Sequence, residues 1–114
     1  MHEFSLCEGI IKQTVRANHE ETNNLATVTI EVGKLAGVDI ESLSFWFPVV
    51  AGKLNCPQLQ LQVNEIDGRA RCNSCNHDFI LQNLYDPCPN CGVFGNYQIM
   101  QGREMLIKSF TKLP

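Results

Sequence analysis

Two closely spaced cysteine pairs constrain the fold of this chain more than any other feature of its sequence. Cys72-x-x-Cys75 and Cys88-x-x-Cys91 are separated by a spacer of twelve residues. Two residues between thiolates allow both sulfurs to bind one ion, and two such turns complete a tetrahedral site. The spacing therefore predicts a structural zinc ion bound by four thiolates.

The residues around the pairs support this interpretation over two disulfides or a redox CxxC. Asn76 and Gly92, which follow the pairs, are the residue types that best tolerate the left-handed conformation of a tight turn. A redox CxxC normally occurs singly and opens a helix. Four thiolates also leave no open position for a catalytic water, so we expect no enzyme activity at this zinc.

Composition narrows the possible partners and the compartment. The 114 residues carry a formal net charge of −3 with a pI of about 5.5, and no basic cluster suggests nucleic-acid binding. No apolar run approaches the roughly 20 residues of a membrane span. The N-terminus has no basic start, and His2, Glu3 and Glu8 interrupt any apolar stretch, so we expect no signal peptide. We therefore expect a cytoplasmic protein with reduced thiols.

Hydrophobic periodicity predicts a mixture of helices and strands. Apolar residues recur at helical spacing over residues 4–18, and strict alternation marks strands at 25–33 and 59–66. Asp39 is the expected N-cap of a second helix that starts near Ile40, is kinked or restarted at Pro48 and stops at Gly52. Two further short strands are expected around a turn at Gly102.

This order predicts an α+β fold. We expect a small mixed or antiparallel sheet with two helices on one face, and an inserted zinc-ribbon-like domain with the four cysteines. The predicted boundaries are residues 1–66 and 96–114 for the α/β domain and 67–95 for the zinc-binding domain.

The remaining cysteines and histidines have simpler interpretations. Cys7 is expected to be a small core residue, and Cys56 a buried or half-buried loop thiol. His77 is expected to be an exposed loop residue, with a pH-sensitive hydrogen bond to a ligand sulfur as the alternative. His19 is expected at the end of the first helix, where a cation interacts favourably with the helix dipole.

The N-terminal Met-His-Glu could form a second metal site. If nothing precedes Met1, its amine and the His2 amide nitrogen close a five-membered chelate ring, and the His2 amide and ring Nδ1 close a six-membered one. The Glu3 amide or carboxylate could supply a fourth donor. Nitrogen donors in a plane suit Ni(II) or Cu(II). The alternative is an ordinary helix entry, in which His2 is exposed and Glu3 complements the dipole.

Several motifs together resemble the HypA/HybF family of hydrogenase nickel incorporation proteins over nearly the whole chain. They are MHEFSL, EVGKLAGV, ESLSFWF, the CNSC and CPNCG turns, and GREMLIKSF. The resemblance implies a metallochaperone that carries Ni²⁺ as transient cargo for [NiFe]-hydrogenase maturation, and some relatives also serve urease. It implies nickel binding at His2 beside Glu3, and zinc at Cys72, Cys75, Cys88 and Cys91.

The resemblance also implies partners, namely a HypB-type GTPase and the hydrogenase large subunit or its maturation complex. The alternative is a zinc-ribbon adaptor that binds another protein and has no nickel role. A strand pair after an insert could be exchanged between chains, so a monomer and a swapped dimer are both compatible with the sequence.

Overall fold

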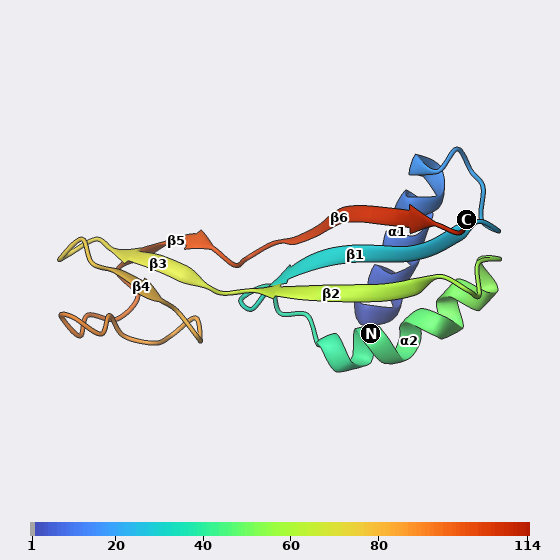
Figure 1. The fold of residues 1–114 in the computed structure, drawn as a ribbon. Coiled ribbons are helices and arrows are strands. Elements are labelled where there is room, and N and C mark those ends of the chain that lie inside the picture. The colour runs from blue at the N-terminus through green and yellow to red at the C-terminus, as the bar shows by residue number, and fades with distance from the viewer. Residues whose placement is uncertain (1) are drawn as a thin grey trace. The chain divides into compact units, whose positions relative to one another are not determined.

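The computed structural model describes residues 2–114, apart from the side chain of His2. Two helices and six strands follow one another along this part of the chain (Figure 1), which confirms the α+β class. In chain order they are α1 (His2–Ala17), β1 (Leu25–Gly33), α2 (Ile40–Lys53), β2 (Gln60–Ile66), β3 (Arg69–Cys72), β4 (Asp78–Ile80), β5 (Tyr97–Gln101) and β6 (Met105–Lys112). None of these helices is long and apolar enough to span a membrane.

The strands form two three-stranded sheets, with the orders β2-β1-β6 and β4-β3-β5. The first sheet is mixed. The Lys34 N–H donates to the Ile66 carbonyl, so β1 and β2 end together and run parallel, with α2 as their connection. The Leu113 N–H donates to the carbonyl of Asn24, so β6 ends where β1 starts and runs antiparallel to it.

The chain divides into two compact units, and strands β1, β2 and β6 each contribute to both. One unit comprises the chain up to Ile30, Val38–Asn64 and Ile107–Pro114, and the other comprises Glu31–Gly37 and Glu65–Leu106. Strand β5 falls in the range 96–114 that was predicted for the α/β domain, yet it pairs with β3 in the second sheet.

The core of the first unit lies between the two helices and β1. Its buried side chains come from one face of α1 (Cys7, Ile10, Ile11, Thr14), from β1 (Leu25, Val28, Ile30) and from α2 (Leu43, Phe47, Val50, Ala51). Thr14 can be buried because its hydroxyl donates to the Ile10 carbonyl at 2.7 Å. The strict alternation predicted for residues 25–33 does not hold at the first residue of β1, because Leu25 and Val28 are both fully buried.

Helix boundaries follow the predicted signals with two differences. The Asp39 carboxylate accepts from the Ser42 N–H at 3.2 Å, so the predicted N-cap is confirmed. Of the kink or restart expected at Pro48, the restart does not occur, because α2 continues through Pro48, and the helix ends at Lys53, one residue after the expected stop at Gly52. Helix α1 begins at His2 and not at residue 4, which places the N-terminal sequence motif in its first turn.

Three glycines lie in close backbone contact in the second unit. A Cβ on Gly33 would lie 2.0 Å from the Gly102 carbonyl oxygen, and a Cβ on Gly102 would lie 2.6 Å from the Cα of Gly68. Gly102 also has a φ of +101°, which L side chains rarely adopt. The ends of β1 and β5 and the start of β3 can therefore meet only because these positions lack side chains.

Candidate metal centres

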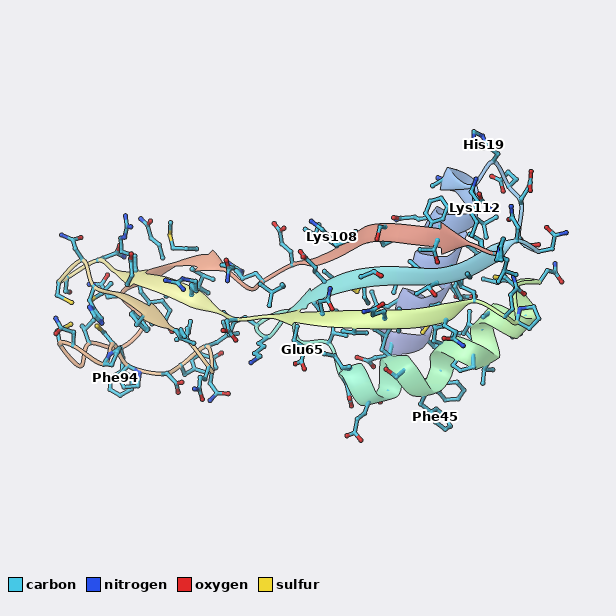
Figure 2. The ribbon with its side chains drawn as sticks, in the orientation of Figure 1. His19, Phe45, Glu65, Phe94, Lys108 and Lys112 are labelled. Atoms are coloured by element: carbon cyan, nitrogen blue, oxygen red, sulfur yellow. The ribbon has the colours of Figure 1, made fainter. Side chains whose placement is uncertain are left out.

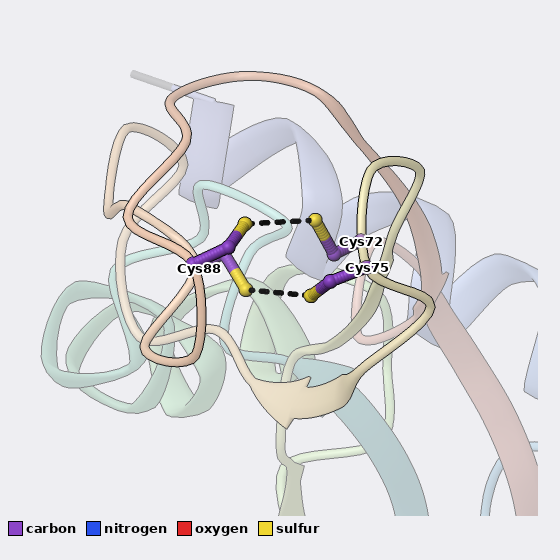
Figure 3. A group of neighbouring side chains, drawn as sticks. Cys72, Cys75 and Cys88 are labelled. Atoms are coloured by element: carbon purple, nitrogen blue, oxygen red, sulfur yellow. Dashed lines mark hydrogen bonds between the residues drawn. The ribbon is translucent and has the colours of Figure 1, made fainter.

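The four predicted cysteine ligands lie together in the second unit. The sulfurs of Cys72 and Cys91 are 3.6 Å apart, and those of Cys75 and Cys88 are 3.7 Å apart. All four sulfurs lie within 4.8 Å of one another. Figure 3 shows the first pair facing the second across the site.

These sulfur distances fit a tetrahedral ion and not disulfides. Metal–sulfur bonds of about 2.3 Å place the corners of a tetrahedron about 3.8 Å apart. A disulfide instead requires an S–S distance of about 2.05 Å, and all four cysteines are free thiols. The donor set, four sulfurs with no oxygen ligand, is the one typical of structural zinc.

Both cysteine turns have the same backbone hydrogen bonds. In the first turn the Asn76 N–H donates to the Cys72 carbonyl at 2.9 Å, and in the second the Gly92 N–H donates to the Cys88 carbonyl at 2.8 Å. Asn76 and Gly92 have φ values of 61° and 78°, as their residue types predicted. The chain therefore folds each pair into a tight turn that aims both sulfurs at one point.

The second sheet and its core fix the first turn in place. Strand β3 ends at Cys72, which pairs with Tyr97 of β5, and β4 follows the turn directly. Phe79 and Leu81 pack with the buried Cys72 and Cys88 in one hydrophobic cluster. This hydrophobic cluster is small, so by itself it contributes only modestly to the stability of the unit.

Two of the four clustered cysteines differ strongly in the pKa of their thiols. Hydrogen bonds from the Asn90 side chain and the His77 amide lower the pKa of Cys75 to about 6. The Val93 amide lowers that of Cys91, but burial and the neighbouring thiols raise it more, to about 12. A divalent cation favours the thiolate form of every ligand, so metal binding releases protons.

Cys7, Cys56 and His77 have the structural roles expected of them. Cys7 and Cys56 are fully buried, and burial raises the pKa of Cys7 to about 11. The Cys7 thiol donates to the Leu43 carbonyl at 3.4 Å, which joins α1 to α2. His77 is exposed and its ring stacks on Phe79, so the loop role is confirmed. His19 is exposed after α1.

At the N-terminus, the structure ties Glu3 to the second helix. The Asp39 N–H donates to the Glu3 carboxylate at 3.2 Å. This hydrogen bond is the main reason that the pKa of Glu3 lies below its usual value. Sequence reasoning identified Asp39 as an N-cap but missed this second role, because no local pattern indicates a contact across so many residues. Met1 and the His2 side chain lie outside the described part of the chain.

Aromatic residues reinforce the same junction between α1 and α2. The Phe4 ring makes an edge contact with Trp46 at 5.6 Å between centroids, and the Lys53 ammonium lies 5.5 Å from the Phe4 centroid. Two kinds of contact therefore hold the start of α1 against α2: the packing of the Phe4 ring and the hydrogen bond from the Asp39 N–H to the Glu3 carboxylate.

The Glu3 contact predicts an acid-sensitive contribution to stability. Because the pKa of Glu3 is lowered on folding, the charged carboxylate stabilises the fold above its unfolded pKa, and this stabilisation is lost as the pH falls through the folded pKa. Glu3→Gln should therefore be less stable than wild type at about pH 6, with the difference shrinking towards about pH 3. Urea unfolding at both pH values measures this. Glu21→Gln controls for the change of net charge, and the same wild-type advantage at both pH values would refute the prediction.

The fold and the sulfur cluster define a class: an α+β protein with a separate four-thiolate metal module. A family described as "Hydrogenase/urease nickel incorporation, metallochaperone, hypA" matches residues 1–112. The chain therefore belongs to the HypA family.

Individual relatives agree with this assignment. The hydrogenase maturation factor HypA of Francisella philomiragia subsp. philomiragia is 41% identical over 111 residues, which cover 97% of this chain and 98% of the relative. That of Chlorobaculum tepidum is 35% identical over 112 residues, with coverage of 97% and 98%. The solution structure of the Ni metallochaperone HypA from Helicobacter pylori shares the fold, with a TM-score of 0.63, 24% identity and 97% coverage of both chains.

Proposed function

We propose that this protein delivers Ni(II) during the maturation of a [NiFe]-hydrogenase, and that a HypB-type GTPase and the hydrogenase large subunit are its partners. The family match over residues 1–112 is the observation that carries the proposal. In this proposal nickel is the cargo, and urease is a second acceptor besides the hydrogenase. The chain itself catalyses no reaction, and it delivers nickel in the cytoplasm.

The start of α1 supports a nickel site built from backbone and His2. The first four N–H groups of a helix have no intrahelical acceptor. Because α1 begins at His2, the amides of His2 and Glu3 belong to this group. A metal such as Ni(II) can displace their protons without breaking a helical hydrogen bond. For a chain whose first residue is Met1, the ligands in this proposal are the Met1 amine, the His2 amide and the His2 ring.

The structure favours a supporting role for the Glu3 side chain. Its carboxylate already accepts a hydrogen bond from Asp39, which ties the first turn of α1 to the start of α2. We assign the fourth nickel donor to the Glu3 amide or to water, and we assign the carboxylate to holding the motif in place. Release is then acid-sensitive, because the amine and imidazole must lose protons to bind nickel.

The second metal in this proposal is a structural Zn²⁺ bound by Cys72, Cys75, Cys88 and Cys91. The sulfur distances of 3.6 and 3.7 Å support this assignment. Zinc has no redox chemistry and accepts four thiolates in a closed tetrahedral shell, so it stabilises the second unit and does not exchange readily with cargo nickel.

Exposed apolar residues support the alternative function of a protein-binding adaptor. On the second unit, 87% of Tyr85 and 71% of Phe94 are exposed. Such side chains are common at protein interfaces. An adaptor without a nickel role would need these residues and would not need His2.

Complementation of a host that lacks its own family member tests the proposal. His2→Ala should lower hydrogenase activity at limiting nickel, and excess nickel should restore it. The control is Ser5→Ala, at an exposed position nearby in α1. Full activity of His2→Ala at limiting nickel, together with loss of activity in Tyr85→Ala/Phe94→Ala, would support the adaptor function instead.

A further inference from the structure

The outer side of α2 carries apolar side chains that the described chain leaves exposed. Phe45, Trp46 and Val49 follow one another closely along the helix and are 68%, 38% and 46% exposed. In Figure 2 the side chain of Phe45 points out of α2, away from the sheet. The outer side of a surface helix is normally polar, so an apolar outer side indicates a contact with another molecule.

Helix α1 continues this apolar surface beside α2. The Phe4 ring meets the edge of Trp46 at 5.6 Å between centroids. Further along, a groove of about 200 Å³ is lined by Ile11 and Val15 of α1 and by Leu54, which follows α2 directly. Phe4, Ile11 and Val15 are spaced by seven and four residues, so they lie along one side of α1. With the exposed residues of α2 they form one apolar strip, the helix-pair surface.

Positive charges border the helix-pair surface. Lys12 and Arg16 line the groove together with Glu20, and Lys53 lies in the last turn of α2. Glu8, one turn before Lys12 in α1, is the second carboxylate in this region. Neither Lys12 nor Arg16 has an ion-pair partner among residues 2–114. Cations thus outnumber carboxylates here, although the whole chain has nine Lys and Arg and twelve Asp and Glu.

We propose that the helix-pair surface binds an acidic amphipathic helix of the protein that receives nickel from this chain, an inference that rests on the proposed delivery function. A helix that docks into an apolar groove does so through apolar residues on one face. Acidic residues beside that face would pair with Lys12, Arg16 and Lys53. Phe4 follows His2 by two residues in α1, so a partner that covers Phe4 lies next to the N-terminal motif.

The number of charges favours a protein helix over an anionic membrane. Recognition of anionic lipid headgroups typically uses a cluster of about four to eight Lys and Arg. The helix-pair surface has Lys12, Arg16 and Lys53, with Glu8 and Glu20 among them. A few cations around an apolar strip instead match the few carboxylates that flank the apolar face of one helix.

Trp46 can report on binding, because it is the only tryptophan in the chain and lies in the helix-pair surface. The probe is a synthetic peptide of about 16 residues of Glu, Leu and Ala, long enough to form a helix, with its leucines on one face. Added to the zinc-loaded full chain, it should shift the Trp46 emission to shorter wavelength in a saturable way. The same peptide with Lys in place of Glu should bind about tenfold more weakly.

Charge-reversal variants test whether the cations select the acidic peptide. Lys12→Glu/Arg16→Glu should prefer the Lys peptide, and Lys12→Gln/Arg16→Gln, which keeps good helix formers, should lose most of the preference. Arg103→Glu/Lys112→Glu makes the same change of net charge at exposed positions outside the helices and should bind like wild type.

Four results would overturn the proposal. They are the absence of a saturable shift with the Glu peptide, equal binding of the Glu and Lys peptides by wild type, and an unchanged preference in Lys12→Glu/Arg16→Glu. The fourth is a shift caused by phosphatidylglycerol vesicles and not by the Glu peptide, which would assign the surface to a membrane.

Complementation separates this docking from nickel binding itself. Lys12→Glu/Arg16→Glu should bind nickel like wild type in calorimetry and still lower hydrogenase activity at limiting nickel, whereas His2→Ala should lose both. Full activity of Lys12→Glu/Arg16→Glu beside an inactive His2→Ala would overturn the docking and leave nickel delivery intact. Full activity of His2→Ala would instead refute delivery from the N-terminal motif, and the proposed docking with it.

Discussion

Cys72→Ser is expected to unfold the second unit while α1 and α2 stay folded. Cys72 is buried, its sulfur lies 3.6 Å from that of Cys91, and it ends β3. A serine oxygen is a poor replacement for a thiolate, and structural zinc contributes on the order of 10 kcal/mol to the folding of such modules. The hydrophobic cluster around Phe79 and Leu81 is too small to replace that contribution.

Amide hydrogen exchange checks this prediction by region. In Cys72→Ser, and in wild type after zinc chelation, residues 69–101 should lose protection, and the helices should keep theirs. His77→Ala is the matched control, because His77 lies in the same turn with an exposed side chain and is not among the four sulfur ligands. Unchanged protection in Cys72→Ser would show that the unit folds without a complete ligand set.

Gly33→Ala is expected to cause the second large loss of stability. The added Cβ would lie 2.0 Å from the Gly102 carbonyl oxygen, and that carbonyl accepts a hydrogen bond from the Leu35 N–H. Neither partner is a flexible side chain, so the backbone must move. We expect a cost of about 3 kcal/mol, near the upper end for overpacked sites.

The control is a glycine inside a helix, where substitution by alanine is expected to increase the stability of the protein and not to lower it. Gly9 lies inside α1, and a Cβ added there meets no atom within 4 Å. Gly9→Ala should raise the free energy of unfolding by about 0.5–1 kcal/mol, because alanine favours the helix. Urea unfolding of both variants measures the contrast. Equal midpoints for Gly33→Ala and wild type would contradict the close approach of these backbones.

Local sequence signals predicted most of the elements. The alternation in residues 25–33 gave β1 with its observed bounds, and Asp39 marked the start of α2. The two CxxC turns were predicted together with the left-handed residues that close them, Asn76 and Gly92. These features depend on neighbours in the chain, so a pattern in the sequence can encode them.

Features that depend on distant residues could not be predicted in this way. The strands around Gly102 resemble a hairpin in sequence, but β5 pairs with β3 and β6 lies beside β1. The short strands β3 and β4 were missed because their periodicity covers few residues. The hydrogen bond between Asp39 and Glu3 and the contact between Gly33 and Gly102 also join segments far apart in the chain.

A calorimetric nickel titration tests the central claim most directly. It compares untagged, zinc-loaded protein that begins at Met1 with its His2→Ala variant. The account predicts one tightly bound nickel per wild-type chain, its loss in His2→Ala, and four-cysteine zinc retained in both proteins. Equal nickel binding by the two proteins, or no binding by wild type, would contradict a nickel site at the N-terminus and favour the zinc-containing adaptor.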